Sequence, residues 1–264
     1  RALEVAVRWK RIGRNVCDAV EPPKVDAPQF YVLTAQDVAA ILEAVRGERK
    51  PPEKPRKRWS ALREKMMADE LRRLYAFFVA ATHTGMRLGQ LLGLKWEDVD
   101  FDTGTIWVRR ALEKGGAQPV FTSSKNRKAN EVPMTRELAE ALRAWKVDQE
   151  LERATYGPDY QDFGLVFCQA NGRPLNARSL NRHFCPRVKA AAGLPEHVRL
   201  HDLRHTLVSR ALAAGANVRA VSEIVGHHDP GFTLKRYAHA IRADRQDAVR
   251  RLEEYLRKPH TGYG

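Results

Sequence analysis

With 264 residues, 43% of them hydrophobic and 30% charged, the chain has the composition of a globular protein with one large domain or two modest ones. Its 46 Lys and Arg residues against 32 Asp and Glu give a net charge of +14, which favours a polyanionic partner, most often nucleic acid, over a merely basic soluble protein. Three cysteines without paired spacing indicate neither a disulfide framework nor a zinc knuckle, and no apolar run approaches the ~20 residues that span a bilayer.

The N-terminal segment predicts a division of the chain into two parts. The chain begins at Arg1 rather than Met and shows no signal peptide, so we expect a fragment or a processed form of a cytoplasmic protein. Apolar positions within residues 1–16 predict one helix, the last of a missing domain, and the three prolines of residues 21–28 predict a linker. Residues 1–28 therefore form the end of one domain, and residues 29–264 form another.

A strongly basic segment follows the first helix of the second part. Thr34 is expected to cap that helix, with Asp37 three residues later. Residues 49–58 then hold six basic residues, one acid and three prolines. A solvated, mobile loop is the simplest explanation of this composition, and contacts with nucleic-acid phosphates are compatible with it. The candidate phosphate contacts are Arg49, Lys50, Lys54, Arg56, Lys57 and Arg58.

A glycine turn joins two predicted helices in the middle of the chain. Residues 71–82 predict a helix that stops at Gly85, and residues 87–94 predict a shorter one. Arg87 lies at the start of the second helix, where free N–H groups and the helix dipole attract phosphate. Arg87 is therefore a candidate phosphate ligand.

The remaining pattern predicts a mainly helical α+β fold. Residues 105–109 and 130–134 predict short strands of a small antiparallel sheet near residues 103–134. Lys125 lies in the polar turn between them, where its ammonium could reach a leaving oxygen, although an ordinary hairpin lysine fits the same pattern. Helices are predicted for residues 135–153, 176–192, 201–213, 217–225, 230–240 and 243–257.

The C-terminal third carries residue types that suit cleavage of a phosphodiester. His201 and Arg204 are three residues apart and share one face of a helix, and a guanidinium can fork onto two phosphate oxygens. His227 follows Gly226 in a turn from which it can donate to phosphate. Tyr237 is the candidate nucleophile, with arginine neighbours that favour its phenolate. Each of these residues also has a simpler explanation: the spacing of His201 and Arg204 can arise by chance, His227 can cap a helix, and Tyr237 can pack in a core. The evidence for phosphodiester chemistry is therefore their joint occurrence.

The order of these residues resembles that of the tyrosine recombinase family, which includes the phage-type integrases and Xer-like recombinases. The resemblance covers roughly residues 30–245. The matching stretches are Thr84-Gly-Met-Arg-Leu-Gly-Gln-Leu-Leu-Gly-Leu-Lys-Trp96, Ser124-Lys-Asn-Arg-Lys-Ala-Asn-Glu-Val-Pro133, His201-Asp-Leu-Arg-His-Thr206, and Val225-Gly-His through Tyr237-Ala-His239. The resemblance implies that residues 1–28 are the end of a core-binding domain plus linker and that residues 29–264 are the catalytic domain.

The resemblance implies a site-specific recombinase that cleaves and rejoins double-stranded DNA through a 3′-phosphotyrosine, integrating or excising a phage or other mobile element. The reaction would need no metal, ATP or other cofactor. The implied catalytic residues are Arg87 and Arg204 as the phosphate clamp, Lys125 as general acid, His201 for proton transfer, His227 as hydrogen-bond donor and Tyr237 as nucleophile. The implied partners are DNA, a homotetramer on DNA and accessory DNA-bending proteins, in the bacterial nucleoid or a phage-infected cell.

Gln90 departs from the family pattern, which usually has Glu or Asp at this place. Gln90 can accept a hydrogen bond but carries no charge, so we expect a site that is tuned differently or is less active. The basic insertion at residues 49–58 is also longer than the connection usual in the family.

The predicted helix over residues 243–257 carries Val249, Leu252 and Leu256 on one side. We expect this stripe to dock on a neighbouring protomer, with packing on its own domain as an equally good alternative.

Two other functions stay open. A type IB topoisomerase has similar chemistry but relaxes supercoils as a monomer. A non-catalytic DNA-binding module would explain residues 217–240 as a helix-turn-helix, but it leaves Arg87, Lys125 and His201 without a role. A metal-dependent nuclease is disfavoured because the sequence shows no clustered carboxylates.

Overall fold

The chain is described by a computed structural model over residues 2–21, 30–47, 73–123, 130–181, 185–227 and 229–240, together with Val249, Glu253 and Arg257. Contacts divide it into two compact units, residues 1–30 and residues 31–264. None of the described helices combines the length and the apolar character that crossing a membrane requires.

The N-terminal unit holds a short helix instead of the single helix predicted over residues 1–16. α1 spans Ala2–Arg8 and is closed by Lys10, which adopts a left-handed conformation with φ of 56°. The N–H groups of Lys10 and Arg11 bond back to carbonyls of the last turn. None of the residues of α1 is buried, so no core supports a longer helix. A short 3-10 turn, η1, follows at Val16–Ala19.

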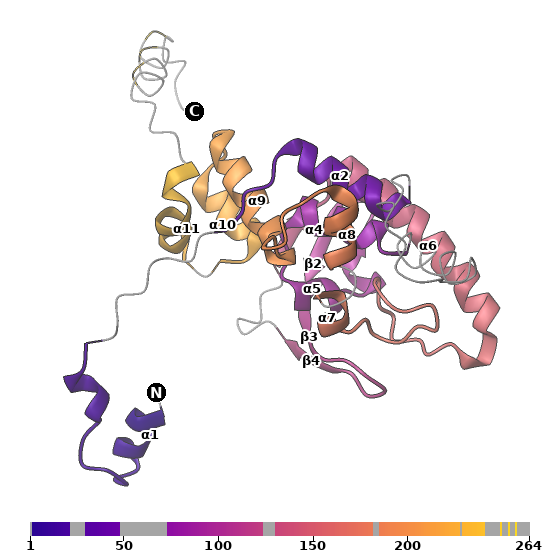
Figure 1. Cartoon of the computed structure of the whole chain (residues 1–264). Coiled ribbons are helices and arrows are strands. Elements are labelled where there is room, and N and C mark those ends of the chain that lie inside the picture. The colour runs from indigo at the N-terminus through magenta and orange to yellow at the C-terminus, as the bar shows by residue number, and fades with distance from the viewer. Residues whose placement is uncertain are drawn as a thin grey trace, which may run out of the picture. The chain divides into compact units, whose positions relative to one another are not determined.

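Helices are the main secondary structure in the described part of the second unit (Figure 1). They are α2 (Ala35–Arg46), α4 (Tyr75–Thr84), α5 (Leu88–Leu92), α6 (Arg136–Tyr156), α7 (Ala177–Ser179), α8 (Cys185–Ala192), α9 (Leu200–Ala213), α10 (Val218–Val225) and α11 (Pro230–Tyr237). Short 3-10 turns lie at η2 (Trp96–Asp98), η3 (Gly157–Asp159) and η5 (Ala238–Ala240). α4 is apolar on nearly all sides and packs against α2, α6 and α9, so it forms the centre of the core.

Several helix ends lie where the sequence predicts them, because capping is local chemistry. Thr34 Oγ1 accepts a hydrogen bond from the N–H of Asp37, whose carboxylate accepts from the N–H of Thr34. α4 ends at Gly85, which is left-handed with φ of 60°. Within the helix predicted over residues 176–192, the structure describes α7, π-helical backbone at Leu180 and Asn181, and α8 from Cys185, while residues 182–184 lie outside the described residues.

Two small antiparallel sheets replace the single predicted sheet. The first has the order β1-β2-β5 and confirms the two predicted strands, with Ile106 opposite Val132. The second is a hairpin of β3 and β4 that the sequence pattern missed, because its strands are mostly exposed and lack a clear alternation of apolar residues. The strands are β1 (Val99–Asp100), β2 (Thr105–Val108), β3 (Arg110–Lys114), β4 (Val120–Ser123) and β5 (Asn130–Pro133).

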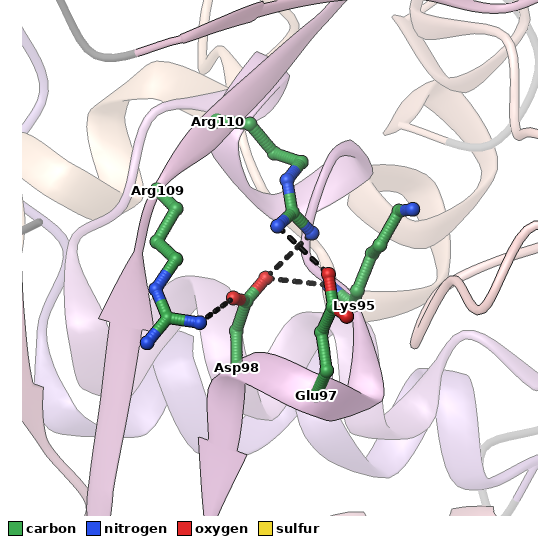
Figure 2. A network of polar contacts seen from close by, with 5 residues as sticks. All are labelled: Lys95, Glu97, Asp98, Arg109 and Arg110. Atoms are coloured by element: carbon green, nitrogen blue, oxygen red, sulfur yellow. Dashed lines mark hydrogen bonds and ion pairs between the residues drawn. The ribbon is translucent and has the colours of Figure 1, made fainter.

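A buried carboxylate holds the junction between the two sheets (Figure 2). Asp98 in η2 is 1% exposed and accepts hydrogen bonds from Arg109 Nη1 at 3.2 Å and Arg110 Nη1 at 2.8 Å. Arg110 also pairs with Glu97 at 2.8 Å. Burial raises the pKa of Asp98, while the charge of Arg110 and the N–H of Lys95 oppose that rise. Because the two arginines lie where β2 leads into β3, the network fixes the point at which the chain leaves one sheet for the other.

The hairpin lies in backbone contact with α5. A Cβ atom on Gly93 would lie 2.7 Å from the backbone nitrogen of Leu112 in β3, and one on Gly89 would lie 3.2 Å from the carbonyl oxygen of Leu112. Only glycine permits such an approach at Gly93. The hairpin therefore supports the short helix that Arg87 begins.

Candidate active site

Arg204 is a buried arginine with an unused donor. It lies in α9, is 3% exposed, and donates through Nη1 to the carbonyl of Gly85 at 2.5 Å. Its Nη2 is buried and has no hydrogen-bond partner among the described residues. Burial, with the charge of Arg87, lowers the pKa of Arg204 to about 10, so the group stays a cation at neutral pH. A buried cationic donor without a partner is costly, which indicates a site for an anion.

Arg87 brings a second guanidinium to the same place. It is the N-cap residue of α5, and its Nη2 donates to the carbonyl of Gly226 at 3.1 Å. Over the described ranges, neither Arg87 nor Arg204 forms an ion pair with a carboxylate. Because the two charges repel each other, an anion bound by both would relieve that repulsion.

Gln90 has a local role at the start of α5. Its Oε1 accepts a hydrogen bond from the backbone N–H of Arg87 at 2.8 Å. This bond closes the first turn of the helix and orients the residue that carries the exposed guanidinium. A carboxylate at this position could make the same bond and would add a negative charge.

His201 and Arg204 line one cleft of about 570 Å³, as their spacing predicts. His201 is exposed and lies in the first turn of α9. Although the residue as a whole is exposed, partial desolvation of its ring, together with the nearby charge of Arg204, lowers the pKa of His201 and so favours the neutral imidazole. Its ring lies edge-on to that of His205, with centroids 4.8 Å apart.

His227 follows the left-handed Gly226 that ends α10. Its Nδ1 lies 2.7 Å from Thr233 Oγ1, which accepts a hydrogen bond from Ser222 Oγ at 2.6 Å. Since Thr233 accepts from Ser222, its own proton is available to His227 Nδ1, an arrangement that places the imidazole proton on Nε2. Burial and the charge of Arg204 lower the pKa of His227 to about 4, so the ring is neutral.

Tyr237 is buried at the end of α11 and is only 1% exposed. Its hydroxyl lies 2.6 Å from Nδ1 of His205, a residue on α9. Its ring is stacked with that of His227, with centroids 6.3 Å apart. Burial raises the pKa of Tyr237, and the charges of Arg204 and Arg236 only partly oppose this, so the phenol is protonated in this conformation.

Asn130 connects the first sheet to the site. Its Nδ2 donates to the carbonyl of Ile224 in α10 at 2.8 Å, and a Cβ atom on Gly226 would lie 3.4 Å from it. Asn130 is the first residue of β5 and directly follows residues 124–129, which lie outside the described residues. Asn130 itself therefore lies beside Gly226, whose carbonyl accepts a hydrogen bond from Arg87.

The structure brings together five of the six predicted catalytic residues: Arg87, His201, Arg204, His227 and Tyr237. The sixth, Lys125, lies outside the described residues, as do the basic residues 49–58 and most of the predicted helix 243–257. In the described part of the chain, no group of three or more His, Cys, Asp and Glu side chains is placed to hold a metal ion.

The sequence interpretation missed His205 and Asn130. A signal for His205 was present, because it directly follows Arg204 and comes four residues after His201, one helical turn along α9. Asn130 offered no comparable signal, since an asparagine at a strand end is common and its partner lies 94 residues away.

Comparison with known proteins agrees with this arrangement. The model of the phage integrase family matches residues 32–243. The chain belongs to the phage integrase family. A tyrosine recombinase XerC-like protein of Caldanaerobacter subterraneus subsp. tengcongensis is 30% identical over 69% of this chain and 49% of its own length. An integrase of Streptomyces ambofaciens is 29% identical over 92% of this chain and 58% of its own length. The chain thus spans about half the length of the curated relatives it matches.

Two solved structures, a transposon integrase and a recombinase, share the fold of this chain. A complex of the Tn1549 transposon integrase with a circular intermediate DNA matches with a TM-score of 0.66 and 22% identity, covering 95% of this chain and 75% of that one. XerA recombinase matches with a TM-score of 0.56 and 22% identity, covering 98% and 75%. The mainly helical α+β fold with small antiparallel sheets is therefore the fold of this family's catalytic domain.

Proposed function

We propose that this chain carries the catalytic domain of a site-specific recombinase that cleaves and rejoins duplex DNA through a 3′-phosphotyrosine. The observation that carries the proposal is the buried Nη2 of Arg204, which has no hydrogen-bond partner among the described residues and lies beside the guanidinium of Arg87, close enough to Tyr237 for its charge to act on the phenol. A phosphodiester offers the anionic oxygens that no described carboxylate supplies to either arginine.

The proposal assigns a residue to each step of the cleavage. Arg87 and Arg204 would bind the two non-bridging oxygens and stabilise the charge that builds on them. His227, with its proton on Nε2, would donate a further hydrogen bond. Tyr237 would attack phosphorus, forming the Oη–P bond as the P–O5′ bond breaks. The phosphotyrosine conserves the energy of the broken bond, so religation can follow without ATP.

Lys125 would protonate the leaving 5′ oxygen. Lys125 lies outside the described residues, and the support for this role is that Asn130, five residues later in the chain, lies beside Gly226, whose carbonyl accepts from Arg87. His201 would assist proton transfer from the open cleft that it lines with Arg204.

The larger assembly is part of the same proposal. Residues 1–28 would end a core-binding domain, and residues 49–58 would contact the DNA backbone. The helix over residues 243–257 would dock on a neighbouring protomer in a tetramer that integrates or excises a mobile element, with accessory DNA-bending proteins as further partners. The relatives whose names are integrase support the integration part of this proposal.

The decisive experiment is covalent capture on a nicked suicide duplex that carries the target site, read by denaturing gel and by mass mapping of the peptide adduct. The wild-type chain should form an adduct at Tyr237, and Tyr237→Phe should form none. Tyr156→Phe, at an exposed tyrosine at the end of α6, is the matched control and should behave as wild type. A wild-type chain that binds the duplex but yields no adduct would leave only a non-catalytic binding module, and supercoil relaxation without synapsis of two sites would favour a topoisomerase.

A further inference from the structure

His205 is half-buried in α9 and in direct contact with the nucleophile. Its Nδ1 lies 2.6 Å from the hydroxyl of Tyr237, and the two ring centroids are 5.8 Å apart. The contact joins α9 to the end of α11 across 32 residues of sequence. A phenol has one proton to donate, and a neutral imidazole has one ring nitrogen that can accept it.

The arrangement leads from the buried phenol toward solvent. Tyr237 is 1% exposed, His205 is half-buried, and His201, whose ring lies edge-on to His205 at 4.8 Å, is exposed in the cleft. His205 is thus the imidazole that touches the phenol, and His201 is its neighbour on the open side.

We propose that His205 is the base that receives the phenolic proton of Tyr237 during cleavage and returns it during religation. The inference rests on the proposed recombinase function. As Tyr237 Oη forms its bond to phosphorus and the P–O5′ bond breaks, the proton moves from Oη to His205 Nδ1, while a separate acid protonates the 5′ oxygen. In religation the 5′ hydroxyl returns its proton to that separate acid as it attacks phosphorus, the Oη–P bond breaks, and Nδ1 gives its proton back to the departing phenolate.

The charges around His205 make this base dependent on bound phosphate. It is faced by His201 and Arg204 on its own helix, by Arg236 on α11 and by His227 after α10. Burial is the largest cause that lowers the pKa of His205 to about 4, and these neighbours lower it further. Without DNA the imidazole is therefore neutral and able to accept a proton. A phosphate held by the arginines would offset their charge and raise the pKa of His205, so the base strengthens as the scissile phosphate arrives.

The first test replaces His205 with asparagine in the suicide-duplex assay. The side-chain amide oxygen that this substitution introduces can occupy the place of Nδ1 and keep the hydrogen bond, but it cannot take the proton. His205→Asn should therefore slow adduct formation by about 10²-fold or more while DNA binding is unchanged. His83→Asn is the matched control, because His83 Nδ1 also bonds a hydroxyl, Thr135 Oγ1 at 2.7 Å, away from the site, and it should cleave as wild type.

The second test separates proton transfer from positioning. Incorporation of 3,5-difluorotyrosine at position 237 makes the phenol more acidic and reduces its need for a base. It should recover most of the rate that His205→Asn loses, to within about tenfold of the wild type. Cleavage by His205→Asn at the wild-type rate, or a defect that the acidic phenol leaves untouched, would overturn the proposal.

A third measurement does not depend on activity. In the DNA-free chain, ¹⁵N NMR should find the proton of His205 on Nε2, which leaves Nδ1 as the acceptor from Tyr237. If the proton is instead on Nδ1 of His205, the Tyr237 oxygen is the acceptor of the hydrogen bond, and His205 is not the base. If the wild-type chain forms no adduct, the proposed function fails. The NMR measurement of the His205 tautomer does not depend on adduct formation, so it tests the base assignment separately.

Discussion

At the scale of single residues, burial decides what each cation of the site contributes. Arg87 is exposed and can be solvated by water, whereas Arg204 is 3% exposed with one nitrogen that lacks a partner among the described residues. An unsatisfied buried cation costs folding free energy, and a bound phosphate oxygen restores that loss. The unsatisfied nitrogen of Arg204 therefore lowers the stability of the free fold and strengthens the binding of phosphate.

Gln90→Glu should stabilise the fold. The new carboxylate keeps the bond to the N–H of Arg87 and adds a negative charge in the first turn of α5, worth about 0.3–1 kcal/mol. Nearby cations depress the pKa of such a carboxylate, so the gain is present at neutral pH and is lost as the pH falls through that pKa, below about 4. Urea unfolding at pH 7 and pH 3 measures the effect. Gln90→Ala, which loses the bond, should lower the free energy of unfolding by about 1 kcal/mol; a glutamate variant no more stable than wild type would contradict this account.

Lys125→Ala should slow cleavage by about 10²–10⁴-fold, because in the proposed mechanism the leaving 5′ oxygen then lacks its acid. A substrate with a 5′-bridging sulfur has a leaving group that needs no proton, so it should restore the rate to within about tenfold of the wild type. Single-turnover cleavage of the two substrates provides the comparison. If the sulfur substrate fails to rescue the variant, Lys125 acts in some other way.

At the scale of elements, local chemistry explains which predictions hold. The cap at Thr34 and the stop at Gly85 depend on residues within one turn, and both are where the sequence places them. The sequence pattern did not predict the hairpin of β3 and β4, because the hairpin is held by backbone contact with α5 at Gly89 and Gly93. The spacing of apolar residues along the chain does not indicate such a contact. The same contact links the hairpin to the position of Arg87.

Gly93→Ala should destabilise the domain by about 1–3 kcal/mol, because its Cβ would meet the backbone of Leu112 at 2.7 Å and β3 must move. Gly115→Ala in the same hairpin is the control: its Cβ would meet its nearest atom at 3.6 Å, an ordinary contact, and its stability should change little. Urea denaturation of both variants gives the comparison, and equal stabilities would show that the close approach costs nothing.

At the scale of the whole molecule, we expect the net charge of +14 to make the affinity for DNA, the proposed partner, depend on salt. The Kd should rise by about 10³-fold or more between about 50 and 200 mM salt if some six to ten phosphates are contacted. Replacing Lys54 and Lys57 by glutamine should reduce the slope of log K against log salt by about one unit per lost contact. Fluorescence titration across salt concentrations measures both. An unchanged slope would assign residues 49–58 to a solvated loop.

Deleting residues 243–264 should reduce assembly of the tetramer on DNA while leaving binding of one protomer nearly intact, because the predicted stripe of Val249, Leu252 and Leu256 would be lost. Of these three residues, the structure describes Val249, and its side chain is exposed. Mass photometry of the complexes on one duplex and on two gives the measurement. Assembly that is the same with and without these residues would count against exchange of the helix and favour packing on its own domain.

The sequence by itself determined the family, the mainly helical α+β class and the identity of the residues that gather around Arg204. These follow from order, spacing and capping, which are properties of neighbouring residues. Tertiary structure decided that Arg204 Nη2 is buried without a described partner, that Gln90 holds the N–H of Arg87, and that His205 touches Tyr237. The reason is physical: burial and the contact across α9 and α11 depend on how helices distant in sequence pack, and no local pattern encodes which of two nearby histidines meets the phenol.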